Sequence, residues 1–142
     1  MTNFYFPIIL VVAANIIYHL SQKSIPQGVN PIVSTIVAYG VALIASIMLY
    51  PFFADGQTVV NQLKEINWST YAVGVAIVGI EVGFLLAYRI GWNVSFGAIF
   101  SNATATILLI PLGLLFFKEK ISLINIAGIV MCIAGLWMII KK

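Results

Sequence analysis

Five long hydrophobic runs, separated by short polar segments, dominate the sequence. They span residues 4–20, 31–53, 68–88, 96–117 and 123–140. An α-helix rises about 1.5 Å per residue, so about 20 residues cross the roughly 30 Å hydrocarbon core of a bilayer. The runs are too long for membrane strands and do not alternate in polarity. The pattern predicts an all-α membrane protein, a bundle of five transmembrane helices forming one domain over residues 1–142.

The segments between the runs are too short to fold as domains of their own. Residues 21–30 contain Pro26 and Gly28, which are typical of a turn. Residues 54–67 form the longest segment, and a short interfacial helix is expected there from Val59, Val60 and Leu63. Any function therefore resides among the helices.

The composition agrees with a membrane location. Hydrophobic residues make up 62% of the chain and charged residues 8%, whereas a soluble domain carries roughly 25% charged residues. The formal net charge is +3, but the basic residues stand singly or in pairs at the ends of the runs. That arrangement is typical of membrane-end anchors and gives no basic stripe for nucleic acid.

Residue types needed for catalysis are scarce. One cysteine is present, so no intrachain disulfide can form, and with one histidine the sequence shows no metal-ligand spacing and no Ser–His–acid grouping. We therefore expect no enzymatic activity, no cofactor and no metal.

The lysines and arginines give little orientation signal. With five crossings, the side of the amino terminus carries three of them (Lys64, Lys118 and Lys120) and the other side carries four (Lys23, Arg89, Lys141 and Lys142). The chain either inserts one way, with the balance due to chance, or inserts both ways. In the second case, two oppositely oriented copies would make a ten-helix inverted repeat, a common transporter plan.

The closing segment carries a family resemblance. Residues 110–142 read IPLGLLFFKEKISLINIAGIVMCIAGLWMIIKK: an apolar helix, a turn with the acidic Glu119, and a last helix with Gly128 and Gly135. With Pro26 and Pro31 after the first run, the chain resembles one repeat of the EamA-type drug/metabolite transporter superfamily. Full-length members contain two such repeats in inverted orientation, so the chain resembles the half-size, five-helix type.

The resemblance implies a transporter, but it does not supply a functional residue. The smaller four-helix multidrug-resistance proteins, relatives by analogy, place their key acid on the first helix. The first run here contains no acid, so that role cannot be transferred.

Glu81 is the strongest candidate for function. It is an acid in the middle of the third run, with no charge within seven residues on either side. Placing a charge at the bilayer centre costs on the order of 2.5–3.5 kcal/mol, so Glu81 should face a cavity or a partner and bind a proton or a substrate cation. The alternative is a protonated carboxyl that holds two helices together. Helical spacing places Tyr88 on the same face, with Trp92 if the helix continues.

Other polar residues extend the candidate substrate and proton site. Asn15, Tyr18 and His19 form a stripe with Gln22 on the first helix, and Asn102 and Thr106 share a face of the fourth. Interhelical hydrogen bonding is the alternative role for both sets. Gly128, Cys132 and Gly135 make a stripe of small residues on the fifth helix, which is either a dimer contact or ordinary packing within the chain.

Together these features predict a secondary active transporter, an exporter of small organic solutes in the plasma membrane. It would work by proton-coupled alternating access as an antiparallel homodimer, and its substrates could include cations. Two alternatives remain: a subunit of a lipid-linked substrate flippase, and a non-transporting membrane scaffold or regulator.

Overall fold

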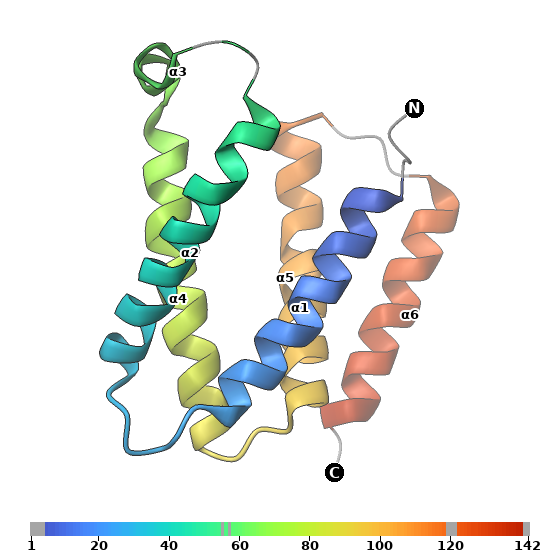
Figure 1. Ribbon diagram of the computed structural model, residues 1–142. Coiled ribbons are helices and arrows are strands. Elements are labelled where there is room, and N and C mark those ends of the chain that lie inside the picture. The colour runs from blue at the N-terminus through green and yellow to red at the C-terminus, as the bar shows by residue number, and fades with distance from the viewer. Residues whose placement is uncertain (1–4, 55, 57, 119–121, 141–142) are drawn as a thin grey trace. The chain divides into compact units, whose positions relative to one another are not determined.

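The computed structural model describes residues 5–54, 56, 58–118 and 122–140, with the backbone alone for 136, 139 and 140. Within these ranges the chain forms six helices (Figure 1). They are α1 (Phe6–Ser24), α2 (Pro31–Phe53), α3 (Val59–Glu65), α4 (Trp68–Arg89), α5 (Val94–Phe116) and α6 (Leu123–Ile140).

Four of the five predicted spans are confirmed as helices long and apolar enough to cross a membrane: α1, α2, α4 and α5. The fifth, α6, is a helix of 18 residues whose apolar part is described over Leu123–Gly135. The short helix predicted between the second and third spans is present as α3. Its position at the membrane interface stays a prediction, as does the single domain over residues 1–142.

The largest boundary error lies at the end of the first span. We predicted its end at residue 20, but α1 continues to Ser24. Two polar side chains of this last turn find hydrogen-bond partners while the backbone stays helical. Ser24 Oγ donates to the Leu20 carbonyl at 2.8 Å. Lys23 donates to the carbonyl of Tyr88 on α4 at 3.1 Å. The other predicted bounds lie within two residues of the structure, and those at 31, 53, 68, 123 and 140 coincide with it.

Local sequence signals explain where several helices begin and end. The Asn30 side chain accepts a hydrogen bond from the Ile32 amide before α2, and Asn67 does the same for Ser69 before α4, both at 2.9 Å. After α4, Gly91 has φ +107°, a conformation that glycine adopts without the cost borne by other residues. Gly91 therefore ends the helical path of α4 without steric strain.

Contacts divide the chain into two compact units, Met1–Ile90 and Gly91–Lys142. In the first unit α4 packs against both α1 and α2, and in the second α5 packs against α6. Within the first unit, α3 lies at the end opposite to the α1–α2 connection (Figure 1).

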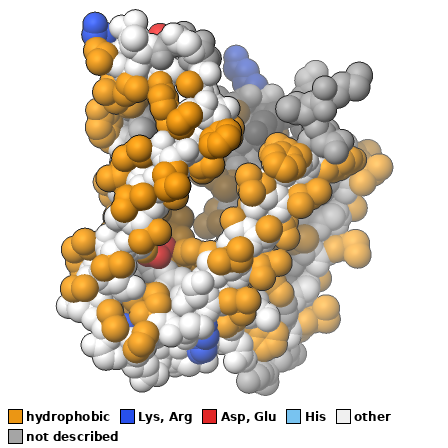
Figure 2. Space-filling model, in the orientation of Figure 1, with side chains coloured by type: hydrophobic (Ala, Val, Ile, Leu, Met, Phe, Trp, Pro, Cys, Tyr) orange, Lys and Arg blue, Asp and Glu red, His pale blue; other side chains and the backbone are white. Residues whose placement is uncertain are grey.

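The first unit is more polar inside than outside. Among the described residues of the chain, the buried polar side chains are His19, Gln22 and Thr35, and the buried hydrophobic ones are Leu85 and Tyr88. Hydrophobic side chains cover the visible outer face, and acidic atoms lie recessed among them between α2 and α1 (Figure 2). This distribution is expected for helices whose outer surface faces lipid rather than water.

Candidate functional site

Glu81 lies near the middle of α4, the helix that packs against both α1 and α2. Its side chain is half-buried. The phenol of Tyr18 on α1 lies close enough to interact with the Glu81 carboxyl, and the phenol of Tyr39 on α2 is near enough to be influenced by its charge. The carboxyl therefore has a phenol from each neighbouring helix in its surroundings; the Tyr39 hydroxyl is buried and makes no hydrogen bond with the described residues.

Gln22 joins Tyr18 to the backbone of α4. Its Nε2 donates to the Tyr18 hydroxyl at 3.4 Å and to the Glu81 carbonyl at 3.3 Å. The Tyr18 hydroxyl also lies 3.5 Å from the carbonyl of Ile80. These contacts fix the polar face of α1 against the turn of α4 that carries Glu81. Asn15, one turn earlier on the same stripe, is half-buried.

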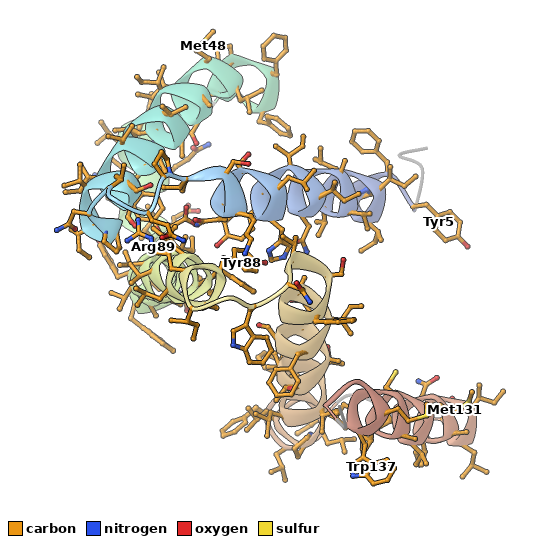
Figure 3. The ribbon with its side chains drawn as sticks, turned by 90° about the horizontal axis from the view of Figure 1, so that it is seen from below. Tyr5, Met48, Tyr88, Arg89, Met131 and Trp137 are labelled. Atoms are coloured by element: carbon orange, nitrogen blue, oxygen red, sulfur yellow. The ribbon has the colours of Figure 1, made fainter. Side chains whose placement is uncertain are left out.

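Below Glu81, His19 and Tyr88 form a buried pair. The Tyr88 hydroxyl and His19 Nδ1 are 2.8 Å apart, and the two side chains are 4% and 6% exposed. The Phe84 ring stacks on Tyr88 with centroids 5.8 Å apart and meets His19 edge-on at 4.7 Å. Tyr88 points toward α1 in Figure 3. The shared face predicted for Glu81 and Tyr88 is thus the face that α4 presents to α1.

Arg89 ends α4 and fixes the α1–α2 connection. Its Nη2 donates to the carbonyls of Pro26, at 3.2 Å, and of Val29. Figure 3 shows Arg89 on the side of that connection, away from Tyr88. The first turn between spans is therefore bound to a residue 60 positions further along the chain.

Trp92 lies beyond the end of the helix that carries Glu81 and Tyr88. We expected it to extend the Glu81–Tyr88 face if the third span continued, but α4 ends at Arg89 and the chain turns at Gly91. Trp92 belongs to the second unit, where its ring lies 5.6 Å from that of Phe100 on α5.

The second unit contains a cavity between α5 and α6, with a volume of about 550 Å³. That volume is in the range of small-molecule sites. The structure brings together here residues that the sequence assigned to different roles: Asn102 and Thr106 to substrate, and Gly128 and Cys132 to a dimer contact. Gly135 is not among the lining residues.

Polar groups in this cavity are few and neutral. The Thr106 hydroxyl donates to the Asn102 carbonyl within α5 at 2.8 Å. Asn125, which the sequence analysis missed, also lines the cavity. Its position three residues before Gly128 placed it on the same helix face and was a usable signal.

Tyr39, Phe84 and the charged pair Lys23 and Arg89 were likewise missed as members of the Glu81 surroundings. Aromatic residues inside an apolar run look like ordinary lipid-facing positions, so only the packing of α2 on α4 identifies Tyr39. Glu119, assigned to the turn before the last helix, lies outside the described residues. Among those that are described, no three His, Cys, Asp or Glu side chains gather as a metal site.

A family model of the EamA-like transporters matches residues 5–141, which is nearly the whole chain. The chain belongs to the EamA-like transporter family. Comparisons with curated proteins and with solved structures found no match. Membership in EamA, together with the four apolar spans, establishes an integral, multi-pass membrane protein of a transporter family.

Proposed function

We propose that this EamA member is a secondary active transporter that exports small organic solutes across the plasma membrane in exchange for protons. Glu81 binds a proton or a cationic substrate, but not both at once. The observation that carries the proposal is the position of this half-buried carboxyl near the middle of α4, the helix that packs against both α1 and α2.

The chemistry of the neighbouring phenols supports a carboxyl that changes its protonation state. A buried charge in a membrane is expensive unless hydrogen-bond donors stabilise it. Tyr18 and Tyr39 can donate to the ionised carboxylate, and neither brings a permanent positive charge that would hold Glu81 ionised.

The surroundings also favour an organic cation as the competitor for the proton. Tyr18 and Phe84 present aromatic rings next to the carboxyl-bearing turn, with ring centroids 5.9 Å apart. The buried Tyr88 ring already has a cation over it, Lys23 Nζ at 5.7 Å from its centroid. Aromatic faces attract cations, and more strongly where water is excluded. His19, Asn15, Trp92, Asn102 and Thr106 remain proposed contributors to binding.

Two copies are proposed to form the working unit. Transporters alternate access by rocking one repeat against an inverted one, and this chain has one repeat with nearly balanced basic residues. An antiparallel homodimer supplies the second repeat. The small residues Gly128, Cys132 and Gly135 on α6 are the proposed contact between copies, since they allow close helix approach.

A transport assay tests the function directly. The purified protein, reconstituted in proteoliposomes, is given a panel of cationic, neutral and anionic solutes with and without a pH gradient. The proposal expects uptake of at least one cationic solute to be driven by the gradient and abolished by a protonophore. Gradient-independent movement of a lipid-linked solute would instead identify a flippase, and the absence of any transport would favour a scaffold.

Cysteine cross-linking tests the dimer. Cys132 is at the middle of α6, so both parallel and antiparallel contacts through this helix bring two copies of it together. In a Cys132→Ala background, Ile124→Cys should cross-link to Met138→Cys on another copy if the pair is antiparallel. Ile124→Cys cross-linking only to itself would establish a parallel pair and contradict the inverted arrangement.

A further inference from the structure

Two buried polar atoms lie unpaired at the end of the α1–α4 contact. Gln22 Oε1 and Arg89 Nε have no hydrogen-bond partner among the described residues. Gln22 as a whole is 3% exposed. Both residues line one cavity of about 60 Å³, together with Lys23, Ile25, Gln27, Leu85 and Tyr88.

The chemistry of these two atoms matches a water molecule. Leaving a buried donor or acceptor unpaired costs about 1–3 kcal/mol. A water can donate to Gln22 Oε1 and accept from the Arg89 Nε–H, and so satisfy both. A buried water needs roughly 10–15 Å³ and two to four polar partners, and the cavity exceeds that volume several times. It therefore has room for a short chain of waters.

The other end of the Gln22 amide faces the candidate site. Nε2 donates to the Tyr18 hydroxyl and to the Glu81 backbone carbonyl, and Tyr18 interacts with the Glu81 carboxyl. One amide thus stands between the cavity and the Tyr18–Glu81 pair.

We propose that this cavity holds water and is the entrance by which protons reach Glu81, with Gln22 as a gate and Tyr18 as the relay. The proposal rests on the proposed function, because it describes how the coupling carboxyl exchanges its proton. It also assigns a side: protons enter at the end of the unit where the α1–α2 connection lies.

The proton step is a relay in which no group is consumed. When the Gln22 amide turns aside, cavity water reaches the Tyr18 hydroxyl. A hydronium ion gives its proton to the Tyr18 oxygen while the original hydroxyl proton passes to a Glu81 carboxylate oxygen. Water is left neutral, tyrosine is unchanged, and Glu81 is protonated. The reverse sequence releases the proton.

The charged and titratable neighbours favour passage rather than storage of protons in the cavity. Glu81 faces Tyr18 from α1 and Tyr39 from α2. Lys23 and Arg89 line the cavity, with the buried His19–Tyr88 pair beside it. Two positive charges repel an excess proton in the cavity water, so the proton moves on to the carboxylate or returns to bulk water.

Infrared spectroscopy after a pH jump tests the route without any substrate. The carbonyl stretch of protonated Glu81, assigned by its loss in Glu81→Gln, is followed in time in reconstituted protein. Gln22→Leu and Tyr18→Phe should each slow its appearance by at least about tenfold, because water or the relay is removed. Gln22→Ala should speed it, because water then reaches Tyr18 directly. Gln62→Leu and Tyr71→Phe are the matched controls and should leave the rate unchanged.

The outcomes separate the route from the proposed function. If Glu81 shows no protonation change at any pH, proton coupling itself is wrong, and the route with it. If the protonated Glu81 signal appears at the unaltered rate in both Gln22→Leu and Tyr18→Phe, the route is wrong but proton coupling is not contradicted. The opposite signs expected for Gln22→Leu and Gln22→Ala distinguish a gate from a residue needed only for folding.

A labelling experiment tests the entrance and its side. In a Cys132→Ala background, Gln27→Cys is modified with a membrane-impermeant methanethiosulfonate. The bulky label should slow Glu81 protonation several-fold because Gln27 lines the cavity. The same label at Gln62→Cys on α3, at the other end of the unit, should have no effect. Complete labelling of Gln27→Cys with no change in rate would overturn the assigned entrance.

Discussion

The two units of the chain use different means to bring helices together in a membrane. In the first, polar side chains of α1 reach α4: Gln22, Lys23 and His19 each bond a partner there. In the second, α5 and α6 surround a cavity of about 550 Å³ lined mostly by small and aliphatic residues. The hydrogen bonds described for Thr106 and Asn125 in that cavity stay within or next to their own helices.

The contrast matters because lipid removes the usual driving force for packing. Apolar helices gain little by leaving lipid for one another, so association depends on hydrogen bonds and on close approach of small residues. Directional bonds hold Glu81 and its neighbours in one geometry, which suits proton exchange. Packing around small residues leaves room beside α5 and α6, which suits a bound solute or a second copy of the chain.

The largest expected effect comes from the polar unit. Glu81→Gln keeps the size of the side chain but cannot ionise, so solute uptake driven by a pH gradient should fall to background while the protein still folds. Glu65→Gln on α3 is the matched control and should transport normally. Cation binding should rise with pH, because only the ionised carboxylate attracts the substrate.

The structural alternative for Glu81 predicts a different pattern. A carboxyl that only joins helices should be replaced well by glutamine, whereas Glu81→Ala should destabilise the protein. Glu81→Asp should retain part of the activity with a shifted pH dependence if the group exchanges protons. Normal pH-driven transport by Glu81→Gln would end the coupling hypothesis.

A second test concerns a property that both units share, the balance of basic residues. Adding Asn61→Lys and Gln62→Lys to α3 raises the count on that side of the membrane from three to five, against four on the other. Most copies should then insert with α3 in the cytoplasm, and activity should fall when this variant is expressed alone. Tags at the two termini report the orientation. If the unaltered protein already faces wholly one way, dual insertion is wrong.

A smaller effect is expected from the apolar unit. Asn102→Leu removes an amide from the α5–α6 cavity, and the loss of one hydrogen bond to solute should raise KM by about two- to tenfold. The rate of Glu81 protonation in the absence of solute should not change, because Asn102 belongs to the second unit and Glu81 to the first. Asn61→Leu on α3 is the matched control. If Asn102→Leu changes the rate of Glu81 protonation but leaves KM unchanged, Asn102 does not contribute to solute binding.

The smallest effect concerns stability alone. Tyr88→Phe removes the hydroxyl that meets His19 Nδ1 and should lower the free energy of unfolding by about 1 kcal/mol. Tyr71→Phe, at an exposed position on the same helix, should leave it unchanged. Denaturant unfolding in detergent measures both. Equal effects of the two substitutions would mean that the buried pair contributes nothing to the packing of α1 on α4.

Sequence patterns predicted the helices well because hydrophobic length is a direct requirement of the bilayer. The stripe of Tyr18, His19 and Gln22 was predicted as one polar face, and that face does meet α4. Partner identity could not be predicted, because it depends on packing: Tyr39 looks like any aromatic residue of an apolar run until α2 lies against Glu81. The hydrogen bond from Arg89 to the Pro26 carbonyl likewise could not be predicted, because the two residues are 63 positions apart in the sequence.

The contact made by Arg89 has a consequence for biogenesis. The connection between the first two spans cannot be clamped until residue 89 has been synthesised, about 60 residues after the carbonyls that it binds. During translation the first helical hairpin therefore enters the membrane without its tertiary anchor. The α1–α2 connection gains this contact only when α4 has been synthesised through Arg89. The arrangement of the first three spans is therefore completed after the first two have already been made.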